Sequence, residues 1–502
     1  MTSNDESISE IQTFFNGTNV FVTGATGFIG HVLVEKLLRQ CFLNKLYLLV
    51  RRKKNKDPQT RLHEMFSSQL FTRLWDEQPE FIEKVLLISG DCAEPNMGLS
   101  GADEEFIVEN IDIVIHCAAT INLNGPLKHT SFINVRATRD LLLIARRMRR
   151  LKSFVQVSTA FVNPEQKFTE EIIYDCHMKG DALINLVENM SDSILKSITP
   201  ECLGTWPNTY TLSKCVAENL VKEYGQNMPI CIARPGIVVY TNDEPIPGWV
   251  NTMKSVPGLC LGVGLGAIHV LYANPNTNAV ILPADNVANM IITAAHHASK
   301  PRSNPTIPVF NHVPNNMAPP LTYGQALNYV VDIILKKKLF SDNQVWKPSI
   351  FFTTSNVLFT ILFFLYHYLP AYLVDSCLWI AGKKPRTTKI YKKLEVMMKD
   401  MRYFGDVDLK FDDRQLKALI SSQSDEDKKL FNMDLSNMEW DKYFLKVILG
   451  IKKYILKDSE DRTFGQRRYQ TIVLAYYALW IIICGCLLYL SYVLLKMIFL
   501  IN

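Results

Sequence analysis

The chain has 502 residues, which is long enough for more than one domain and a large core. An apolar content of 48% and a charged content of 21% are typical of globular proteins, and a net charge of +5 is too small to indicate nucleic-acid binding. The polar first residues lack the apolar core of a secretory signal. Eleven cysteines without the spacing of a zinc site indicate free thiols in a reducing compartment.

A polar tail, expected over residues 1–18, leads into a glycine-rich stretch at residues 19–30, NVFVTGATGFIG. This stretch combines a short apolar strand, three glycines and the start of a periodic helix. Glycines at these points allow a tight turn, a close approach of a diphosphate and contact between helix and strand. The diphosphate then lies on the helix N-terminus. The predicted nucleotide-binding residues here are Gly24, Thr26, Gly27, Phe28, Ile29 and Gly30.

Apolar runs alternate with helical stretches from residue 19 to about residue 300. The runs are VFVTG, KLYLLV, VLLISGD, IDIVIHCAA, SFVQVST and ICIARPGIVV. This alternation predicts an α/β fold, a Rossmann-type doubly wound parallel sheet with helices on both faces. Ligands of such sheets bind at the carboxyl ends of the strands. Residues 19–300 are therefore expected to form a nucleotide-binding catalytic domain.

The second run ends in Arg51 and Arg52, about twenty residues beyond the glycines, where an NAD-binding chain would carry an acidic side chain. Arginine pairs instead with a 2′-phosphate, so the sequence predicts NADPH as the cofactor. The alternative is a solvated basic loop, which suits the lysines that follow better than the two arginines.

Three other strand ends supply the remaining expected cofactor contacts. Asp91 follows VLLISG, where a strand end would meet the adenine ring, although it could equally cap the next turn. Small side chains close the fourth run and allow the cofactor to lie against the backbone. The residues expected at these two ends are Cys117, Ala118, Ala119 and, at the end of the sixth run, Pro235.

Tyr210 and Lys214 are the predicted catalytic pair, and both are also expected to contact the cofactor. Their spacing of four places them on one face of a helix, so the ammonium can lower the phenol pKa and hold the nicotinamide ribose. Tyr210 would then protonate the alkoxide that hydride transfer leaves. Ser158 and Thr159 end the fifth run, and one of these hydroxyls can donate a hydrogen bond to the carbonyl oxygen. The structural alternative is that both hydroxyls pack a strand end and that Tyr210 is half-buried.

An insertion of apolar helical character precedes Tyr210, around residues 165–206. A substrate lid or tunnel wall and a peripheral helical hairpin packed on the core are equally good interpretations. A linker and substrate-region segment is expected at residues 301–348. Residues 349–380 form an apolar, membrane-associating or tunnel-forming segment, for which a buried or interfacial helix is favoured over a spanning one. A helical C-terminal domain is expected over residues 381–470.

Residues 471–501 carry a single charge, Lys496, over a length that crosses a bilayer, and predict a transmembrane anchor. Basic residues cluster before this run, so the catalytic domain is expected on the cytosolic side. No metal site is predicted, because His116 and His129 have no ligand partners at metal spacing.

TGATGFIG, VSTAFV, YTLSK and ARPGIV together resemble the extended short-chain dehydrogenase/reductase superfamily. PNTYTLSKCVAE, LPAYLVD and FNMDLSNMEWDKYF are similar to alcohol-forming fatty acyl-CoA reductases of the male-sterility type, over nearly the whole chain. The resemblance implies NADPH-dependent reduction of a long-chain fatty acyl-CoA to the primary alcohol through a bound aldehyde, with release of CoA. Asp434 and Leu435 stand where that family carries a more basic or polar sequence.

Two alternatives stay open at this point. A membrane-bound sterol-type dehydrogenase would use the same scaffold, and an inactive nucleotide-binding scaffold protein would keep the fold without turnover. Intact Tyr210 and Lys214 weigh against the second. The membrane is expected to be that of the endoplasmic reticulum or the peroxisome, and the sequence gives no oligomeric state.

Overall fold

The computed structural model describes residues 9–501 apart from residues 54, 303–305 and 315–316. The chain divides into two compact units. Unit 1 consists of Met1–Thr252, Thr277–Thr322 and Tyr403–Glu439, and unit 2 consists of Met253–Asn276, Tyr323–Arg402 and Trp440–Asn502. The segments expected at residues 301–348 and 381–470 are therefore each shared between the two units.

Unit 1 is built on a seven-stranded parallel sheet, which confirms the predicted fold class. The strand order is β11-β7-β5-β4-β1-β2-β3. The strands are β1 Asn19–Thr23, β2 Lys45–Val50, β3 Val85–Ser89, β4 Ile113–His116, β5 Ser153–Val157, β7 Ile230–Pro235 and β11 Val309–His312. The first six coincide with the predicted apolar runs. Every residue of β1, β4, β5 and β7 is buried, as expected for strands covered on both faces.

The edge strand β11 lies inside the proline-marked stretch that the sequence assigned to a linker. It pairs in parallel with β7 from Val309 opposite Ile232 to His312 opposite Pro235. Four residues between prolines give too short an apolar run to stand out, and the neighbouring strand, not the local sequence, determines this conformation. The linker assignment is therefore wrong for these residues.

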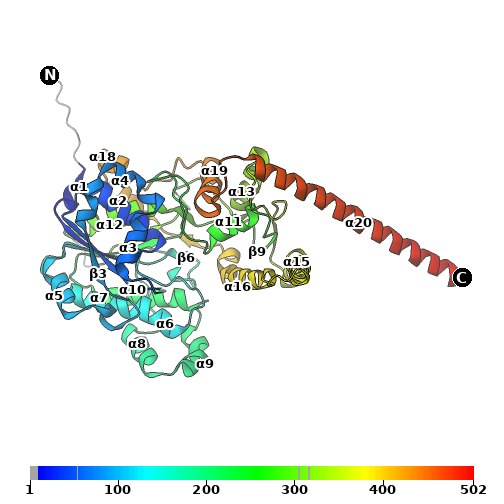
Figure 1. Cartoon of the computed structure of the whole chain (residues 1–502). Coiled ribbons are helices and arrows are strands. Elements are labelled where there is room, and N and C mark those ends of the chain that lie inside the picture. Colours follow the sequence, from blue (N-terminus) through cyan, green and yellow to red (C-terminus); the bar gives the residue numbers. More distant parts are fainter. Residues whose placement is uncertain (1–8, 54, 303–305, 315–316, 502) are drawn as a thin grey trace, which may run out of the picture. The chain divides into compact units, whose positions relative to one another are not determined.

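Helices cover both faces of the sheet (Figure 1). On one face α2 packs against α12, and α12 also contacts β5 and β7; on the other, α7 packs against α10 and α5. The helices of unit 1 are α1 Glu10–Phe15, α2 Phe28–Gln40, α3 Pro58–Phe66, α4 Thr72–Glu77, α5 Gly101–Asn110, α6 Leu127–Ser131, α7 Ala137–Ala145, α8 Gly180–Asn189, α9 Asp192–Leu203, α10 Thr209–Tyr224, α12 Ala284–Ala298, α17 Arg414–Ser421 and α18 Asp425–Leu430.

The chain leaves β1 toward β2 and β3 on one side, and continues from β4 to β5 and β7 on the other. The strand order therefore reverses between β1 and β4. In open parallel sheets a crevice forms at the carboxyl ends of the strands at such a point, and ligands bind there. The glycine turn after β1 and the small residues after β4 both lie at this edge.

The third segment of unit 1, Tyr403–Glu439, returns from unit 2 to complete the domain. Its strand β13 (Lys410–Phe411) pairs with β6 (Phe168–Thr169), and the ring of Phe404 lies 5.0 Å from that of Phe161. The buried Glu171 accepts hydrogen bonds from the first amides of α17, including that of Leu416 at 3.1 Å. This carboxylate caps a helix that begins about 240 residues further along the chain.

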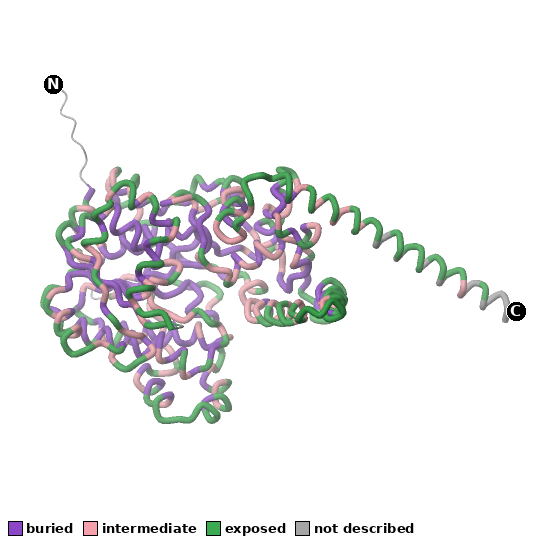
Figure 2. The backbone as a smooth tube through the Cα atoms, viewed as in Figure 1, coloured by how far each residue is buried: buried purple, intermediate pink, exposed green. Residues whose placement is uncertain are grey.

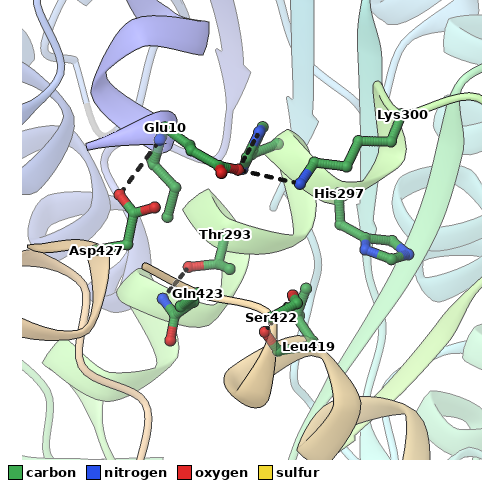
Figure 3. A pocket seen from close by; sticks show the side chains of 10 residues that line it. Glu10, Thr293, His297, Lys300, Leu419, Ser422, Gln423 and Asp427 are labelled. Carbon is green, nitrogen blue, oxygen red and sulfur yellow. Dashed lines mark hydrogen bonds and ion pairs between the residues drawn. The ribbon is translucent and has the colours of Figure 1, made fainter. Parts of the chain in front are cut away.

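A small cavity lies where α1, α12 and this third segment meet (Figure 3). The Ser9 hydroxyl donates to the buried Asp427 carboxylate at 2.5 Å, and Glu10 pairs with Lys300 at 3.2 Å. On the opposite wall the Gln423 amide donates to Thr293 at 3.4 Å. These contacts join α1 and α12 to each other and to the third segment of unit 1, so we assign the cavity a structural role.

Unit 2 is mainly helical, as the sequence predicts for the C-terminal part, and α13 packs against both α11 and α19. Its elements are α11 Val256–Gly264, β9 Val270–Tyr272, α13 Tyr323–Lys337, β12 Phe351–Thr353, α14 Asn356–Phe363, η6 Phe364–Tyr368, α15 Leu369–Ile380, α16 Thr387–Asp406 (whose last residues belong to unit 1), α19 Trp440–Gly450, η7 Ile451–Leu456 and α20 Thr463–Ile501.

Two helical stretches of unit 2 are largely exposed (Figure 2), and many of their exposed residues are apolar. The long helix α20 covers the whole of the predicted anchor at residues 471–501. The continuous helix Asn356–Ile380 is, among the described residues, the one found long and apolar enough to cross a membrane. Only 22% of its most apolar window is buried. The expectation of a buried helix is therefore wrong here, and the interfacial and spanning alternatives stay open.

Candidate active site

The glycine turn after β1 leaves no room for side chains at two positions. Gly24 has φ +78°, and a Cβ atom added there would lie 2.7 Å from the amide nitrogen of Ala118. A Cβ atom on Gly30 would overlap the carbonyl oxygen of Gly24 and lie 2.6 Å from that of Ala25. The turn is therefore packed main chain to main chain, both within itself and against the end of β4, where Cys117 and Ala118 lie.

The N-terminus of α2 follows this turn directly. Gly27 is the N-cap residue and no side chain hydrogen-bonds to the first turn, whose first intrahelical bond runs from His31 N to Gly27 O. Phe28 stacks on Trp249 with the ring centroids 5.7 Å apart, while Ile29 is partly exposed. Uncapped amides at a helix start suit an anion, and the Cβ-free cradle admits a diphosphate. The residues present fit a bound dinucleotide.

An arginine that the sequence analysis missed ties the second strand to this turn. Arg61, on α3, donates to the Thr26 hydroxyl at 2.7 Å and to the Arg51 carbonyl oxygen at 2.6 Å. The Arg51 guanidinium is 3.3 Å from the Asp91 carboxylate, and Arg52 is exposed. Arg51 at the end of β2 and Arg61 on α3 are therefore held together close to the glycine turn. No motif in the sequence indicated Arg61, because it lies ten residues beyond Arg51, on the helix that follows β2.

Asp91 caps the turn after β3, which is one of the two roles that the sequence leaves open, and its contact with the adenine stays a prediction. One carboxylate oxygen accepts from the Ala93 amide at 3.0 Å, which caps the turn after β3, and the other faces Arg51. Its place at the carboxyl end of β3 is also where a bound adenine would lie.

Tyr210 and Lys214 occupy successive turns of α10, which begins where the Asn208 side chain accepts from the Thr211 amide at 2.9 Å. Tyr210 is half-buried, whereas Lys214 is only 4% exposed. The Lys214 ammonium donates to the Val157 carbonyl oxygen at the end of β5, at 2.8 Å. The pair is thereby held against the carboxyl edge of the sheet.

The two hydroxyls after β5 differ in their surroundings. Thr159 hydrogen-bonds to the Tyr210 side chain, and its hydroxyl also accepts from the Phe161 amide at 3.3 Å. The Ser158 hydroxyl is buried and has no hydrogen-bond partner among the described residues. Of the two candidates, Thr159 is therefore the one that the fold places beside the phenol.

Burial shifts the pKa values of both members of the pair toward their neutral forms. It raises the pKa of Tyr210 to about 12, partly offset by the hydrogen bond with Thr159. It lowers the pKa of Lys214 to about 8, against the opposing influence of Cys117 and Glu218. At neutral pH the phenol is protonated and the lysine carries its charge. The expected lowering of the phenol pKa by the ammonium is therefore not found, because burial is the larger influence, and the protonated phenol is available to donate a proton.

Asn134 is a second residue that the sequence analysis missed. It lies on the short π-helix Phe132–Arg136, a type of irregularity that often marks functional sites. Its side chain accepts from the Thr120 amide and donates to the Ser213 hydroxyl, both at 2.9 Å, and Ser213 donates to the Tyr210 carbonyl oxygen at 2.7 Å. Asn134 thereby links the loop after β4 to α10, the helix that carries Tyr210 and Lys214.

A buried ion pair connects α10 to the end of β7. The Arg234 guanidinium contacts the Glu218 carboxylate at 2.5 and 2.9 Å, and both side chains are almost fully buried. Arg234 also donates to the carbonyl oxygens of Glu170 and Ile172, which fixes the start of the insertion. Pro235, the next residue, is buried at the strand end.

Replacing Glu218 with Gln is expected to lower the free energy of unfolding by about 3–5 kcal/mol, because it leaves the Arg234 charge buried and uncompensated. Thermal unfolding of the detergent-solubilised protein measures the effect. Glu223, exposed on the same helix, is the matched control, and Glu223→Gln should change stability by less than about 0.5 kcal/mol. Equal melting temperatures for the two variants would contradict this role for the pair.

The insertion before α10 folds as two helices, α8 and α9, that contact α6; α8 also contacts α10. Leu183, Ile184, Val187 and Leu195 join the main core, whereas Ile194 is 48% exposed. The hairpin thus packs on the helical layer that carries Tyr210.

No group of three or more metal-binding side chains occurs among the described residues.

Family models and a solved structure similar to this chain indicate the class of protein to which it belongs. Two family models, both described as "Male sterility protein", match it: an NAD-binding one over residues 22–291 and a "Sterile" one over residues 366–458. The reductase (R) domain of a nonribosomal peptide synthetase from Mycobacterium tuberculosis shares the fold, with a TM-score of 0.56, 20% identity and coverage of 88% of this chain and 94% of that one. The parallel sheet, the glycine turn and the NAD-binding family model define a dinucleotide-binding protein with a Rossmann-type fold.

Curated relatives narrow the class further. "Fatty acyl-CoA reductase wat" of Drosophila melanogaster is 33% identical over 493 residues, covering 97% of this chain and 94% of the relative. "Fatty acyl-CoA reductase 1" of Homo sapiens is 35% identical over 452 residues, covering 89% and 87%. The chain belongs to the fatty acyl-CoA reductase family.

Proposed function

We propose that the protein reduces long-chain fatty acyl-CoA to the primary fatty alcohol with NADPH, through an aldehyde that stays bound, and releases CoA. The observation that carries this proposal is the grouping of Tyr210, Lys214 and Thr159 at the same sheet edge as the glycine turn. Family membership favours this reaction over the sterol-type dehydrogenase and the inactive scaffold.

The protein groups act on the substrate oxygen. The Thr159 and Tyr210 hydroxyls would donate hydrogen bonds to the thioester carbonyl oxygen as negative charge develops on it. When bound, a reduced nicotinamide would supply one hydride, so the two reductions consume two molecules of NADPH. After the first, the C–S bond breaks, and the CoA thiolate takes one proton from the solvent and leaves as the thiol. After the second, Tyr210 gives its proton to the alkoxide, and the charge of Lys214 stabilises the phenolate that results.

The preference for NADPH is assigned to Arg51 and Arg61, with the exposed Arg52 near them. Arg51 and Arg61 are held together by the hydrogen bond from the Arg61 guanidinium to the Arg51 carbonyl oxygen. A 2′-phosphate on the adenosine ribose would face two positive charges, and guanidinium groups bind phosphate with charge-assisted hydrogen bonds.

Replacing Arg61 with Ala is expected to raise KM for NADPH about 10- to 100-fold, since one charge-assisted hydrogen bond to the phosphate is lost. KM for NADH should rise much less, because NADH lacks that phosphate and loses only the support that Arg61 gives to Thr26. The matched control is Lys56→Ala, an exposed basic residue of the same loop that pairs with Glu64. Wild-type protein that used NADH as well as NADPH would contradict the role of both arginines.

Membrane attachment is part of the proposal. The helix α20 would cross the bilayer and keep the catalytic domain in the cytosol, on the membrane of the endoplasmic reticulum or peroxisome, because basic residues precede its apolar run. An anchored enzyme meets long acyl chains at the membrane surface, where such substrates partition.

The decisive experiment incubates membranes that contain the full-length protein with NADPH and acyl-CoAs of graded chain length, and measures fatty alcohol, aldehyde and free CoA. Alcohol and CoA in a ratio of one to one, without accumulated aldehyde, are expected. Release of the aldehyde as the main product would contradict the bound intermediate, and no reduction at any chain length would contradict the proposed substrate class.

A further inference from the structure

The continuous helix formed by α14, η6 and α15 has one buried and one exposed face. Its buried residues recur at every fourth position, which keeps them on one side of a helix: Phe359, Phe363, His367, Ala371 and Asp375. Large apolar side chains between them are 40–78% exposed: Val357, Leu358, Ile361, Phe364, Leu365, Tyr366, Leu369, Tyr372, Leu373, Val374, Trp379 and Ile380. An apolar face of this size is far larger than scattered surface residues would produce.

The buried face is bonded to the rest of unit 2 along its whole length. The ring of Phe359 lies 5.8 Å from that of Tyr272, and His367 accepts a hydrogen bond from the main-chain amide of His269 at 3.0 Å. At the far end Asp375 accepts from the amides of Thr387 and Thr388, both at 2.9 Å. These contacts use polar groups that would be costly to move into hydrocarbon.

Both ends of the helix return to the same unit. Just before it, β12 pairs in parallel with β9, and just after it α16 folds back so that the Tyr391 ring lies 5.3 Å from His367. A spanning helix would place its two ends about 30 Å apart on opposite sides of the bilayer. The observed contacts are incompatible with that arrangement. The exposed face is therefore expected to be covered from one side of the helix, while its other side stays packed on unit 2.

Basic residues follow the apolar face directly. All six are exposed, and none forms a salt bridge among the described residues: Lys383, Lys384, Arg386, Lys389, Lys392 and Lys393. An apolar helix face bordered by unpaired cations complements an anionic lipid surface, where acyl chains and headgroup charges occur side by side.

We propose that the helix Asn356–Ile380 lies in the plane of one leaflet of an anionic membrane, inserts its exposed face among the acyl chains and places the basic residues of 383–393 against the headgroups. This is a membrane contact separate from α20, and it does not depend on the reaction that unit 1 catalyses. A second copy of the chain would cover the same apolar face, and the experiment below distinguishes the two.

The test uses the full-length protein reconstituted into vesicles of phosphatidylcholine, with or without phosphatidylserine. Cys377 is an exposed cysteine of α15, so replacing the exposed Cys484 and Cys486 with serine allows an environment-sensitive dye to be attached there. In a second pair of variants that also carry Cys377→Ser, single cysteines replace Asn343 before the helix and Lys384 after it, for labelling with a membrane-impermeant maleimide.

The dye on Cys377 is expected to shift to the blue and to show a several-fold lower quenching constant with aqueous iodide in vesicles that contain phosphatidylserine. The cysteines at 343 and 384 should both react from the outside of the same vesicles. Lys383→Glu with Lys384→Glu should reduce the ratio of shielded to unshielded dye at least about fivefold for each lysine, because each change removes one attraction and adds one repulsion. The same charge change at Lys336 and Lys337, exposed on α13, should leave it unchanged.

Labelling of the two flanking cysteines from opposite sides would overturn the proposal in favour of a spanning helix. Shielding that does not respond to phosphatidylserine or to the lysines would overturn the assignment of an anionic surface. Cross-linking of Cys377 between copies, with shielding that falls on dilution of the protein in the vesicles, would identify a second copy as the occupant instead.

Discussion

Replacing Tyr210 with Phe is expected to lower kcat for alcohol formation about 10²- to 10⁴-fold, the usual contribution of a positioned general acid. The ring is half-buried on α10 and keeps its shape in the variant, whereas the hydroxyl that meets Thr159 is lost. Fatty alcohol formed from acyl-CoA and NADPH by membranes containing each protein measures the effect. NADPH binding should persist, because the glycine turn is untouched.

Tyr224 provides the control for this substitution. It lies on the same helix, and its hydroxyl donates to Asp181 at 2.5 Å, away from the sheet edge. Tyr224→Phe should leave kcat within about threefold of wild type, since it removes one hydrogen bond that is partly exposed to solvent. Tyr210→Phe protein with near wild-type turnover would mean that another group donates the proton, and the proposed mechanism would fail.

Replacing Gly30 with Ala is expected to abolish cofactor binding and to cost about 3 kcal/mol of stability, at the upper end of the usual range for overpacking. A methyl group there would meet the Ala25 carbonyl at 2.6 and 2.7 Å, and main-chain atoms cannot move away as a flexible side chain can. The turn would have to open, and the amides of α2 would no longer converge on a diphosphate. Thermal melting and NADPH fluorescence measure the two effects.

Gly101 is the matched control, because it also lies in the first turn of a helix of unit 1 and a Cβ atom on it would have no neighbour within 4 Å. Gly101→Ala should keep cofactor affinity and change stability by no more than about 1 kcal/mol, in the stabilising direction. A Gly30→Ala protein that bound NADPH normally would show that the turn is not the diphosphate site.

The sheet was predictable because its strands carry their own signal. β1, β2, β4, β5 and β7 are continuous apolar runs, and a strand buried on both faces can have no other pattern. β11 has no such independent signal. Its four residues form a strand because β7 offers an unpaired edge, and that information is distributed over two distant parts of the chain.

The candidate site residues also divide into those that a local motif reveals and those that depend on distant partners. Gly24, Gly30, Tyr210 and Lys214 were recognisable because each motif is local, a turn or one face of a helix. Arg61 was not, because it reaches the glycine turn through a hydrogen bond to Thr26, 35 residues earlier in the chain. Asn134 depends in the same way on Ser213, 79 residues later. Long-range partners of this kind are not encoded in any spacing.

The choice between Ser158 and Thr159 also required the three-dimensional structure. Both hydroxyls follow the same strand, and no property of either residue type separates them in a one-dimensional pattern. The backbone after β5 turns Thr159 toward Tyr210 and leaves the Ser158 hydroxyl among buried atoms without a described partner. The sequence narrowed the hydrogen-bond donor to two residues, and the fold separates them.

The dependence of unit 1 on Tyr403–Glu439 has a consequence for biosynthesis. Ser9 finds its hydrogen-bond partner, Asp427, 418 residues later, so a nascent chain cannot finish this domain until nearly all of the message has been translated. A premature stop codon before residue 404 would remove α20 and would also leave the Phe161 ring and the strand β6 without their partners. We expect such truncated chains to be unstable, because their unit 1 lacks the segment that completes it.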